Sequence, residues 1–196
     1  MCHIKRERRF RGDIPLEYSH NDVHIGGNMA KTFKDSCKAG GKGEDILYNY
    51  WCNKGYSVSD LRSEREWQKV DVDYRLRTHK GEYLVDVKSD TYFNINFAIE
   101  IVSNTNKNTE GNIKITAADR WYYYFLDANI CYVFNPKAML EFVNENLSKT
   151  ELPKGMRIVH PYTAISNGIG YHSKCVLVPI SLANSNGLIQ AKFRPK

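Results

Sequence analysis

The feature that most constrains the fold is a stretch of alternating residues, 70–76, which is followed by a turn and a second apolar stretch. One face of the first stretch is apolar, and the other carries Asp71, Asp73 and Arg75, with Arg77 next in the same alternation. Alternation with a period of two is typical of a strand that buries one face. Residues 78–82 contain a Lys-Gly turn, and residues 83–88 alternate again. The sequence therefore predicts a β-hairpin with one charged face.

The remaining pattern predicts a mixed α/β fold with a central mixed sheet flanked by helices. We expect helices over 44–54, 116–125 and 137–147, and further strands over 56–58, 97–102, 130–134, 157–159, 175–180 and 188–193. The glycine run 40–43 reads as a flexible break, and Thr116 with Asp119 resembles a helix capping box. Residues 121–125 are aromatic, which favours a buried core and leaves base stacking open. The expected organisation is a basic arm (1–40), a core (41–135), and a helix with a β-rich extension of the same domain (136–196).

Acidic side chains and one lysine converge in this arrangement. Antiparallel pairing in the hairpin brings Asp73 beside Asp86, and Lys88 shares the strand face of Asp86. Glu44 heads the apolar stripe of the first expected helix, where it either complements the helix dipole or joins the other carboxylates. Closely packed carboxylates repel one another unless a cation neutralises them.

Mg²⁺ is the cation that such a group fits, because it prefers oxygen ligands and uses one or two carboxylates with water and phosphate oxygens. It activates water and stabilises the leaving oxygen in phosphodiester hydrolysis. We expect Asp73 and Asp86 to hold the ion, with Mn²⁺ able to substitute for it. Glu44 would bind metal or position water, and Lys88 would orient water or stabilise the transition state.

The segment Asp73…Asp86-Val87-Lys88 resembles the D…(D/E)xK signature of the PD-(D/E)XK, or restriction-endonuclease-like, superfamily. The order of motifs is most similar to that of small phage and bacterial nuclease-like proteins. The matching positions are Gly43-Glu44, Gly55-Tyr56, Gln68, Asp73, Asp86-Val87-Lys88, Asn96, Glu100, Ala118-Asp119 and Tyr123-Tyr124. The resemblance implies a restriction-endonuclease-like core over residues 40–135 and a Mg²⁺-dependent endonuclease acting on DNA. It also implies supporting roles for Gln68 and Asn96.

Two departures from the family pattern leave alternatives open. Val72, not proline, precedes Asp73, and Asp71 shares the predicted strand face of Asp73. Asp71 is therefore the substitute ligand if Asp73 does not bind the metal. Glu100 either supports the ligands or helps to hold a second ion.

The net charge of +6 and the pI of about 9.0 favour an anionic partner. Lys42 and a cluster in the arm, either a solvated tail or a phosphate-binding segment, are the candidate nucleic-acid contacts: Lys5, Arg6, Arg8, Arg9 and Arg11. Five separated cysteines without a C-x-x-C pair favour a reducing compartment. There is no signal-peptide pattern and no apolar run of membrane-spanning length, so we expect a cytoplasmic protein of a bacterium or a phage-infected cell.

Other functions are compatible with the same residues. The chain could be a catalytically inert module of the same fold that binds nucleic acid or protein, or a nuclease directed at RNA. A homodimer would suit cleavage of both strands of a duplex. The intact set of carboxylates with Lys88 counts against the inert module.

Overall fold

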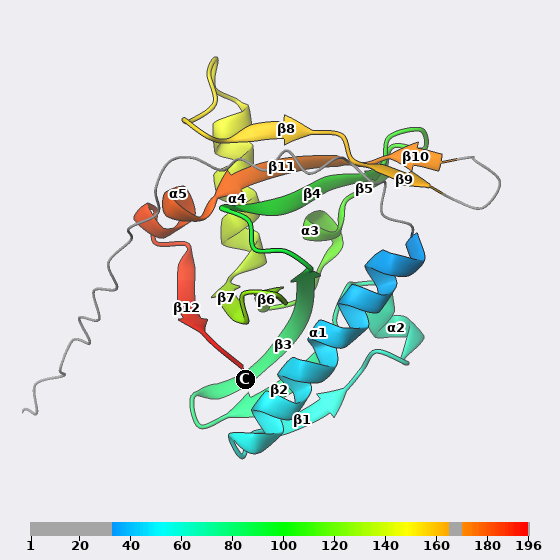
Figure 1. The fold of residues 1–196 in the computed structure, drawn as a ribbon, viewed down its shortest axis with the longest axis vertical. Coiled ribbons are helices and arrows are strands. Elements are labelled where there is room, and N and C mark those ends of the chain that lie inside the picture. The colour runs from blue at the N-terminus through cyan, green and yellow to red at the C-terminus, as the bar shows by residue number, and fades with distance from the viewer. Residues whose placement is uncertain (1–32, 165–169, 196) are drawn as a thin grey trace, which may run out of the picture.

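The computed structural model describes residues 33–164 and 170–195, with backbone alone for 33–39. Helices are interspersed among groups of strands along the chain (Figure 1). The helices are α1 (Phe33–Asn53), α2 (Arg65–Gln68), α3 (Asn112–Ile115), α4 (Pro136–Leu147) and α5 (Ile180–Ser185). The strands are β1 (Ser57–Asp60), β2 (Tyr74–Thr78), β3 (Gly81–Asp90), β4 (Asn96–Asn104), β5 (Thr109–Glu110), β6 (Arg120–Phe125), β7 (Ile130–Phe134), β8 (Arg157–Val159), β9 (Tyr162–Ala164), β10 (Gly170–His172), β11 (Lys174–Pro179) and β12 (Ile189–Phe193).

The central sheet has six strands in the order β1-β2-β3-β6-β7-β12. Strands β3 and β6 are parallel, and every other neighbouring pair is antiparallel, so the sheet is mixed. The predicted hairpin is present as β2 and β3, which pair from Tyr74 with Val85 to Thr78 with Gly81. The fold is thus the mixed α/β arrangement that the sequence predicts.

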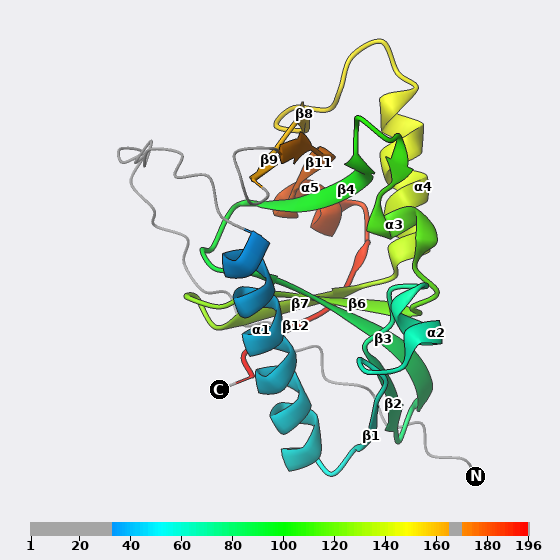
Figure 2. The same ribbon diagram turned by 90° about the vertical axis from the view of Figure 1, so that its right-hand side faces the viewer.

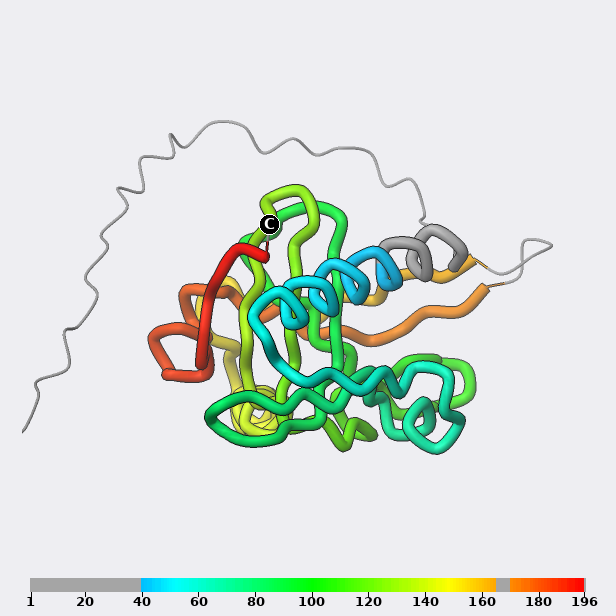
Figure 3. Tube along the Cα trace, turned by 90° about the horizontal axis from the view of Figure 1, so that it is seen from below, coloured from blue at the N-terminus to red at the C-terminus, as the bar shows by residue number. Residues whose placement is uncertain are grey.

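A second sheet has the order β5-β4-β11-β8, and β9 and β10 form a separate two-stranded ladder. Figure 2 shows this four-stranded sheet on the opposite side of the central sheet from α1, with α4 beside it. Seen from below, α1 lies across one face of the central sheet (Figure 3). The central sheet is therefore covered on both faces.

Two apolar cores result from this layering. The first lies between α1 and the central sheet, where Leu47 and Trp51 pack with Val85, Val87 and the strand β6. The second lies between the two sheets and α4, and Phe97, Trp121, Phe134, Met139 and Val176 are among its members. Residues beyond 136 thus share a core with those before it.

Residues 121–125 form strand β6 rather than the predicted helix. All five side chains are buried, with Trp121, Tyr123 and Phe125 in one core and Tyr122 and Tyr124 in the other. A strand buried on both faces reads as a continuous apolar run without alternation, and aromatic residues favour strands. Thr116 does bond to the backbone N–H of Ala118 (3.1 Å), but within a turn that precedes the strand.

The glycine run 40–43 lies inside α1, which begins at Phe33 and so crosses the expected boundary at residue 41. Gly43 faces β3 and β6, and a Cβ there would overlap the side chain of Ser89 and lie 3.4 Å from Tyr124 Cδ1. Helix and sheet approach each other closely at this point because Gly43 has no side chain. In the described part of the chain, no helix has the length and apolarity needed to cross a membrane.

Candidate active site

The backbone of the β2–β3 hairpin fixes Asp73 beside Asp86. Asp73 immediately precedes β2, and its N–H donates to the carbonyl of Val85 (2.9 Å). Its Oδ2 accepts from the backbone N–H of Val87 (2.8 Å). The two bonds lie on either side of Asp86, whose carboxyl is within hydrogen-bonding reach of that of Asp73. The predicted proximity of the two carboxyls is present in the structure.

Lys88 completes the centre from the same strand. Its Nζ lies 2.8 Å from Asp86 Oδ2 and 2.7 Å from Asp71 Oδ2. Asp86 and Lys88 pair in parallel register with Trp121 and Tyr123, and the Lys88 ammonium lies 5.2 Å from the centre of the Trp121 ring. The spacing of two residues thus places both charged groups on one strand face, as the sequence predicts.

Asp71 reaches this centre by a route that the sequence pattern does not show. Residues 70–73 do not belong to a strand, because α2 and a turn precede β2. Asp71 has a φ of 52°, in the left-handed region that Asp tolerates better than most residues. Its carbonyl accepts from Thr116 Oγ1 (3.1 Å). The turn therefore brings the Asp71 carboxylate to Lys88, so Asp71 and Asp73 both lie at the centre.

Burial and mutual repulsion set the charges of the group. Burial raises the pKa of Asp86 well above its usual range, the Lys88 ammonium opposes this rise, and Asp71 and Asp73 add to it. Burial also raises the pKa of Asp73, against the N–H of Val87 and the charge of Lys88. Burial alone would lower the pKa of Lys88, but the carboxylates of Asp86 and Asp71 raise it above its ordinary value. Lys88 is therefore an ammonium at neutral pH, surrounded by more carboxylates than it can neutralise.

Glu44 lies on α1 with one fifth of its side chain exposed, and its Oε2 accepts from Arg62 Nη1 (3.0 Å). Arg62 also binds Asp45 (3.1 Å) and Asp60 (2.6 Å). Burial raises the pKa of Glu44, the hydrogen bond from Arg62 lowers it, and the charge of Asp73 raises it again, with a net rise. Glu44 thus lies within electrostatic reach of Asp73 while Arg62 holds it.

Glu100 approaches the centre from the second sheet. It lies on β4 and accepts from the backbone N–H of Asn112 at the start of α3. Burial raises its pKa, that N–H and the charge of Lys88 lower it, and the charge of Asp71 raises it. The charge of Glu100 is thus felt by both Asp71 and Lys88.

The residues predicted to support the site or to bind nucleic acid lie in different parts of the chain. Gln68 donates from its Nε2 to the carbonyl of Arg62 (2.6 Å). Asn96 is buried at the start of β4 and donates to Asn94 Oδ1 (3.1 Å). Lys42 is exposed on α1, as expected of a surface contact. The arm residues Lys5, Arg6, Arg8, Arg9 and Arg11 lie outside the described residues.

Sequence reasoning missed Arg62 and Asn112. Arg62 lies in a loop without periodicity, so nothing in the pattern marks it as the partner of Glu44. Asn112 sits in a polar segment, and its backbone N–H and buried Oδ1 are revealed only by tertiary structure.

The donor chemistry of the centre fits a hard divalent cation. Two buried oxygens, Asp86 Oδ2 and Asn112 Oδ1, accept no well-directed hydrogen bond from the described residues, although Asp86 Oδ2 is ion-paired with Lys88. Asp71, Asp73 and Glu100 add further carboxylate oxygens, the ligands that Mg²⁺ prefers. No three His, Cys, Asp or Glu side chains in the described ranges are already grouped as ligands of one ion. The Lys88 ammonium instead bridges two of the carboxylates.

Comparisons with known proteins leave the family open. No protein-family model matches the chain, and no curated protein matches it. A solved structure that is similar is that of a bacterial homing endonuclease, I-Ssp6803I, with 14% sequence identity and a TM-score of 0.39. The match covers 56% of this chain and 69% of the other. A similarity at this level carries no argument, so the site must be interpreted from its own residues.

Proposed function

We propose that the chain is a metal-dependent nuclease that hydrolyses phosphodiester bonds in DNA, an endonuclease with a PD-(D/E)XK centre. One observation supports this above the others: the ammonium of Lys88 bridges Asp71 and Asp86, and the carboxyl of Asp73 lies within hydrogen-bonding reach of Asp86. Such a group is costly in a purely structural role, because buried like charges repel one another. It suits a site that receives a cation and a negatively charged phosphate.

Asp73 and Asp86 would hold Mg²⁺, or Mn²⁺ in its place, with Asp71 as the alternative to Asp73. Glu100 is close enough electrostatically to contribute to the same site or to a second ion. When bound, the metal supplies a water of lowered pKa and neutralises charge on the phosphoryl oxygens. Burial, and after it the neighbouring carboxylates, raise the pKa of Asp73 and Asp86, and a bound cation would favour their charged forms.

Lys88 acts as a cation and not as a proton acceptor. Asp86 and Asp71 keep it protonated, so it would donate hydrogen bonds to a non-bridging phosphate oxygen or to the attacking water. A fixed donor in a partly buried site stabilises charge that develops in the transition state. Glu44, held by Arg62, would position the attacking water or bind the metal.

Cleavage of a substrate panel tests the proposal. Supercoiled plasmid, linear duplex, a four-way junction, single-stranded DNA and RNA are incubated with Mg²⁺ or Mn²⁺, beside the Lys88→Ala, Asp86→Ala and Asp73→Ala variants. Lys154→Ala is the matched control, since Lys154 is exposed just before β8. We expect metal-dependent DNA cleavage that Lys154→Ala retains and the other three lose, with circular dichroism confirming that each variant folds.

Each other outcome excludes a part of the proposal. Cleavage retained in Lys88→Ala and Asp73→Ala would contradict the catalytic assignment. Cleavage of RNA alone would replace the DNA substrate with RNA. DNA binding without cleavage of any substrate, at any metal concentration, would favour the inert binding module.

A further inference from the structure

Positive charge gathers at the end of the central sheet where the β2–β3 hairpin turns. The segments that build this end are the last part of α1 with the turn after it (46–59), the hairpin (75–85), β6 (120–126) and β12 (187–195). Together they contain seven Lys and Arg residues and a single acidic residue, Glu82. Glu82 lies 2.7 Å from Arg77 and 3.7 Å from Arg75, so it does not compensate the other cations.

Strand register places one of these cations and a tyrosine ring on the face that α1 covers. Leu76 opposes Tyr83, and Val85 pairs with Arg120. Leu76, Val85 and Tyr122 all belong to the core beneath α1. Directly paired residues point to the same face of a sheet, as do residues two apart on one strand. Tyr83 and Arg120 therefore both lie on the α1 face.

Rings and cations contact one another on this face, where α1 ends. The guanidinium carbon of Arg120 lies 3.5 Å from the centre of the Tyr83 ring, which places the guanidinium over the face of that ring. The Tyr83 hydroxyl donates to the carbonyl of Lys80 (3.2 Å) in the hairpin turn. At the end of α1, Lys54 Nζ lies 5.5 Å from the centre of the Tyr50 ring. Each ring is thus paired with a cation.

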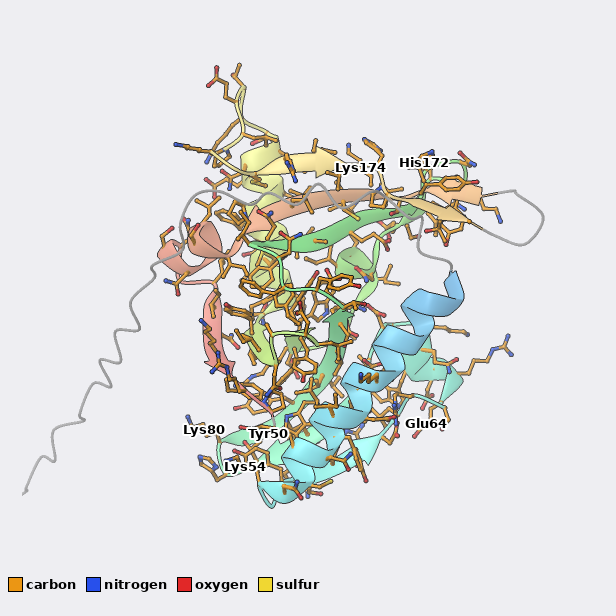
Figure 4. All side chains as sticks on the ribbon, in the orientation of Figure 1. Tyr50, Lys54, Glu64, Lys80, His172 and Lys174 are labelled. Carbon is orange, nitrogen blue, oxygen red and sulfur yellow. The ribbon has the colours of Figure 1, made fainter. Side chains whose placement is uncertain are left out.

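Two further aromatic residues connect these pairs. Phe193 stacks on Tyr50 with ring centres 4.8 Å apart, and its ring centre lies 6.2 Å from that of Tyr122. Tyr122 lies within hydrogen-bonding reach of Arg120. Figure 4 shows Tyr50 and Lys80 at the same end of the molecule. Side-chain contacts therefore run without a break from the end of α1 to the hairpin.

The cations of this surface are not neutralised by the protein. In the part of the chain that the structure describes, Lys54, Lys80 and Arg120 form no ion pair, whereas Arg62 and Lys88 are each bound by carboxylates. Lys54 and Lys80 are exposed, and Arg120 is half-buried. Their charges are therefore available to an anionic partner.

We propose that this sheet-end surface, formed by Tyr50, Lys54, Lys80, Tyr83 and Arg120, binds single-stranded nucleic acid. Cations interspersed with flat groups match a chain that carries one phosphate and one base per unit. The cations attract the phosphates, and the bases stack on aromatic rings and on guanidinium planes. A duplex keeps the faces of its bases covered, so it would use the cations alone.

This surface is separate from the proposed catalytic centre. Tyr83 lies five residues before Lys88 on β3, about 17 Å along the strand. An odd spacing puts the two side chains on opposite faces of the sheet. The location of the surface and the chemistry of its ligand thus do not depend on that centre. Only its use in holding a substrate for cleavage rests on the proposed nuclease function.

Binding without metal tests the surface independently of catalysis. The full chain is titrated in EDTA, at several salt concentrations, against fluorescein-labelled oligothymidylate and an abasic strand of the same length. The variants are Lys54→Gln/Lys80→Gln, Arg120→Lys and the control Lys107→Gln/Lys154→Gln, and circular dichroism checks that each folds. The control changes net charge as the first variant does, and its residues are exposed next to β5 and β8, far from the hairpin turn (Figure 1).

The two test variants should act in different ways. Loss of two phosphate contacts in Lys54→Gln/Lys80→Gln should lower the slope of log K against log salt by about 1.4 and weaken binding of both strands up to about 25-fold at 0.1 M salt. Arg120→Lys keeps the charge but removes the planar group. It should weaken oligothymidylate binding about 5- to 150-fold with an unchanged salt slope, and leave binding of the abasic strand as it is.

Several results would overturn the proposal. Equal weakening by the two double variants would show a response to net charge alone. An equal effect of Arg120→Lys on both strands would exclude base stacking. Tighter binding of a duplex than of oligothymidylate by the wild type would exclude a single-strand site, as would binding only to free nucleotides or to anionic lipid vesicles. The cleavage panel still judges the nuclease assignment separately, because it depends on Lys88 and its carboxylates.

Discussion

Replacing Gly43 by alanine tests the close contact that positions α1 over β3, the strand that carries Asp86 and Lys88. A Cβ at this position would lie 2.8 Å from Ser89 Cβ and nearer still to Ser89 Oγ. The hydroxyl can rotate away, but the Cβ of Ser89 moves only with the backbone of β3. Ser89 directly follows Lys88 on β3, so any accommodation must move α1 or the strand that carries Asp86 and Lys88.

Two opposing effects set the change in the free energy of unfolding that Gly43→Ala should cause. Alanine in a helix interior is favoured over glycine by about 1 kcal/mol. Overpacking a tight contact typically costs about 1–3 kcal/mol. Gly43→Ala should therefore lower the free energy of unfolding by about 0–2 kcal/mol. Gly41 provides the matched control, because a Cβ there meets nothing within 4 Å, and Gly41→Ala should raise it by about 1 kcal/mol.

Urea denaturation of both variants measures the difference, which we expect to be about 1–3 kcal/mol in favour of Gly41→Ala. Thermal melts should separate the two by about 2–12 °C for a chain of this size. A double-mutant cycle with Ser89→Ala locates the cause, because removing Oγ should recover part of the loss in Gly43→Ala. Equal stabilisation by Gly41→Ala and Gly43→Ala would refute the close-contact reasoning.

Two further predictions follow from the charges. Asp86→Asn should raise the free energy of unfolding at neutral pH without metal. The pKa of Asp86 is raised in the folded state, so its contribution to stability is present in acid and is lost as pH rises through that pKa. Asparagine does not ionise and therefore does not suffer this loss. Thermal melts in EDTA from pH 4 to 8 should show that the variant becomes increasingly more stable than the wild type as pH rises, by about 1.4 kcal/mol for each unit by which the folded pKa exceeds the unfolded one. A variant that is less stable than the wild type at every pH would contradict this. Arg62→Met should lower the free energy of unfolding by about 1–3 kcal/mol, because Glu44 and Asp60 lose a charged donor. Arg77→Gln is the control: it breaks an exposed ion pair with Glu82 and should lower the free energy of unfolding by less than about 1 kcal/mol in the same urea experiment. An equal decrease for Arg62→Met and Arg77→Gln would contradict a special role for Arg62.

Local patterns were sufficient to predict much of the fold. The strand over 130–134, the strand over 157–159 and the helix near 137–147 correspond to β7, β8 and α4. Asn135 accepts from the N–H of Ala138 (3.0 Å) and Pro136 follows at the first helical position, so both signals are local. The Asp86 and Lys88 pair was predictable for the same reason, because strand periodicity fixes which side chains share a face.

Periodicity failed where the environment on both sides of an element determines its structure. The run 121–125 has no alternation because β6 is buried between two cores, and the sequence alone does not distinguish a doubly buried strand from a helix. The glycines at 40–43 read as a break because the role of Gly43 in the helix depends on Ser89 of β3, more than forty residues away in sequence. In both cases the deciding contact is tertiary.

The same limit explains why the choice between Asp71 and Asp73 could not be made from the strand pattern. That pattern treats the two as equivalent positions on one face, but the chain turns between them, with Asp71 at a positive φ. Asp71 is bound by Lys88, whereas Asp73 is bound by the backbone N–H of Val87. A side chain fixed by the backbone keeps its place when charges change, and one fixed by a lysine does not. In the proposed metal site Asp73 would therefore be the better preorganised ligand, and Asp71 would have to exchange its partner Lys88 for a cation to bind it.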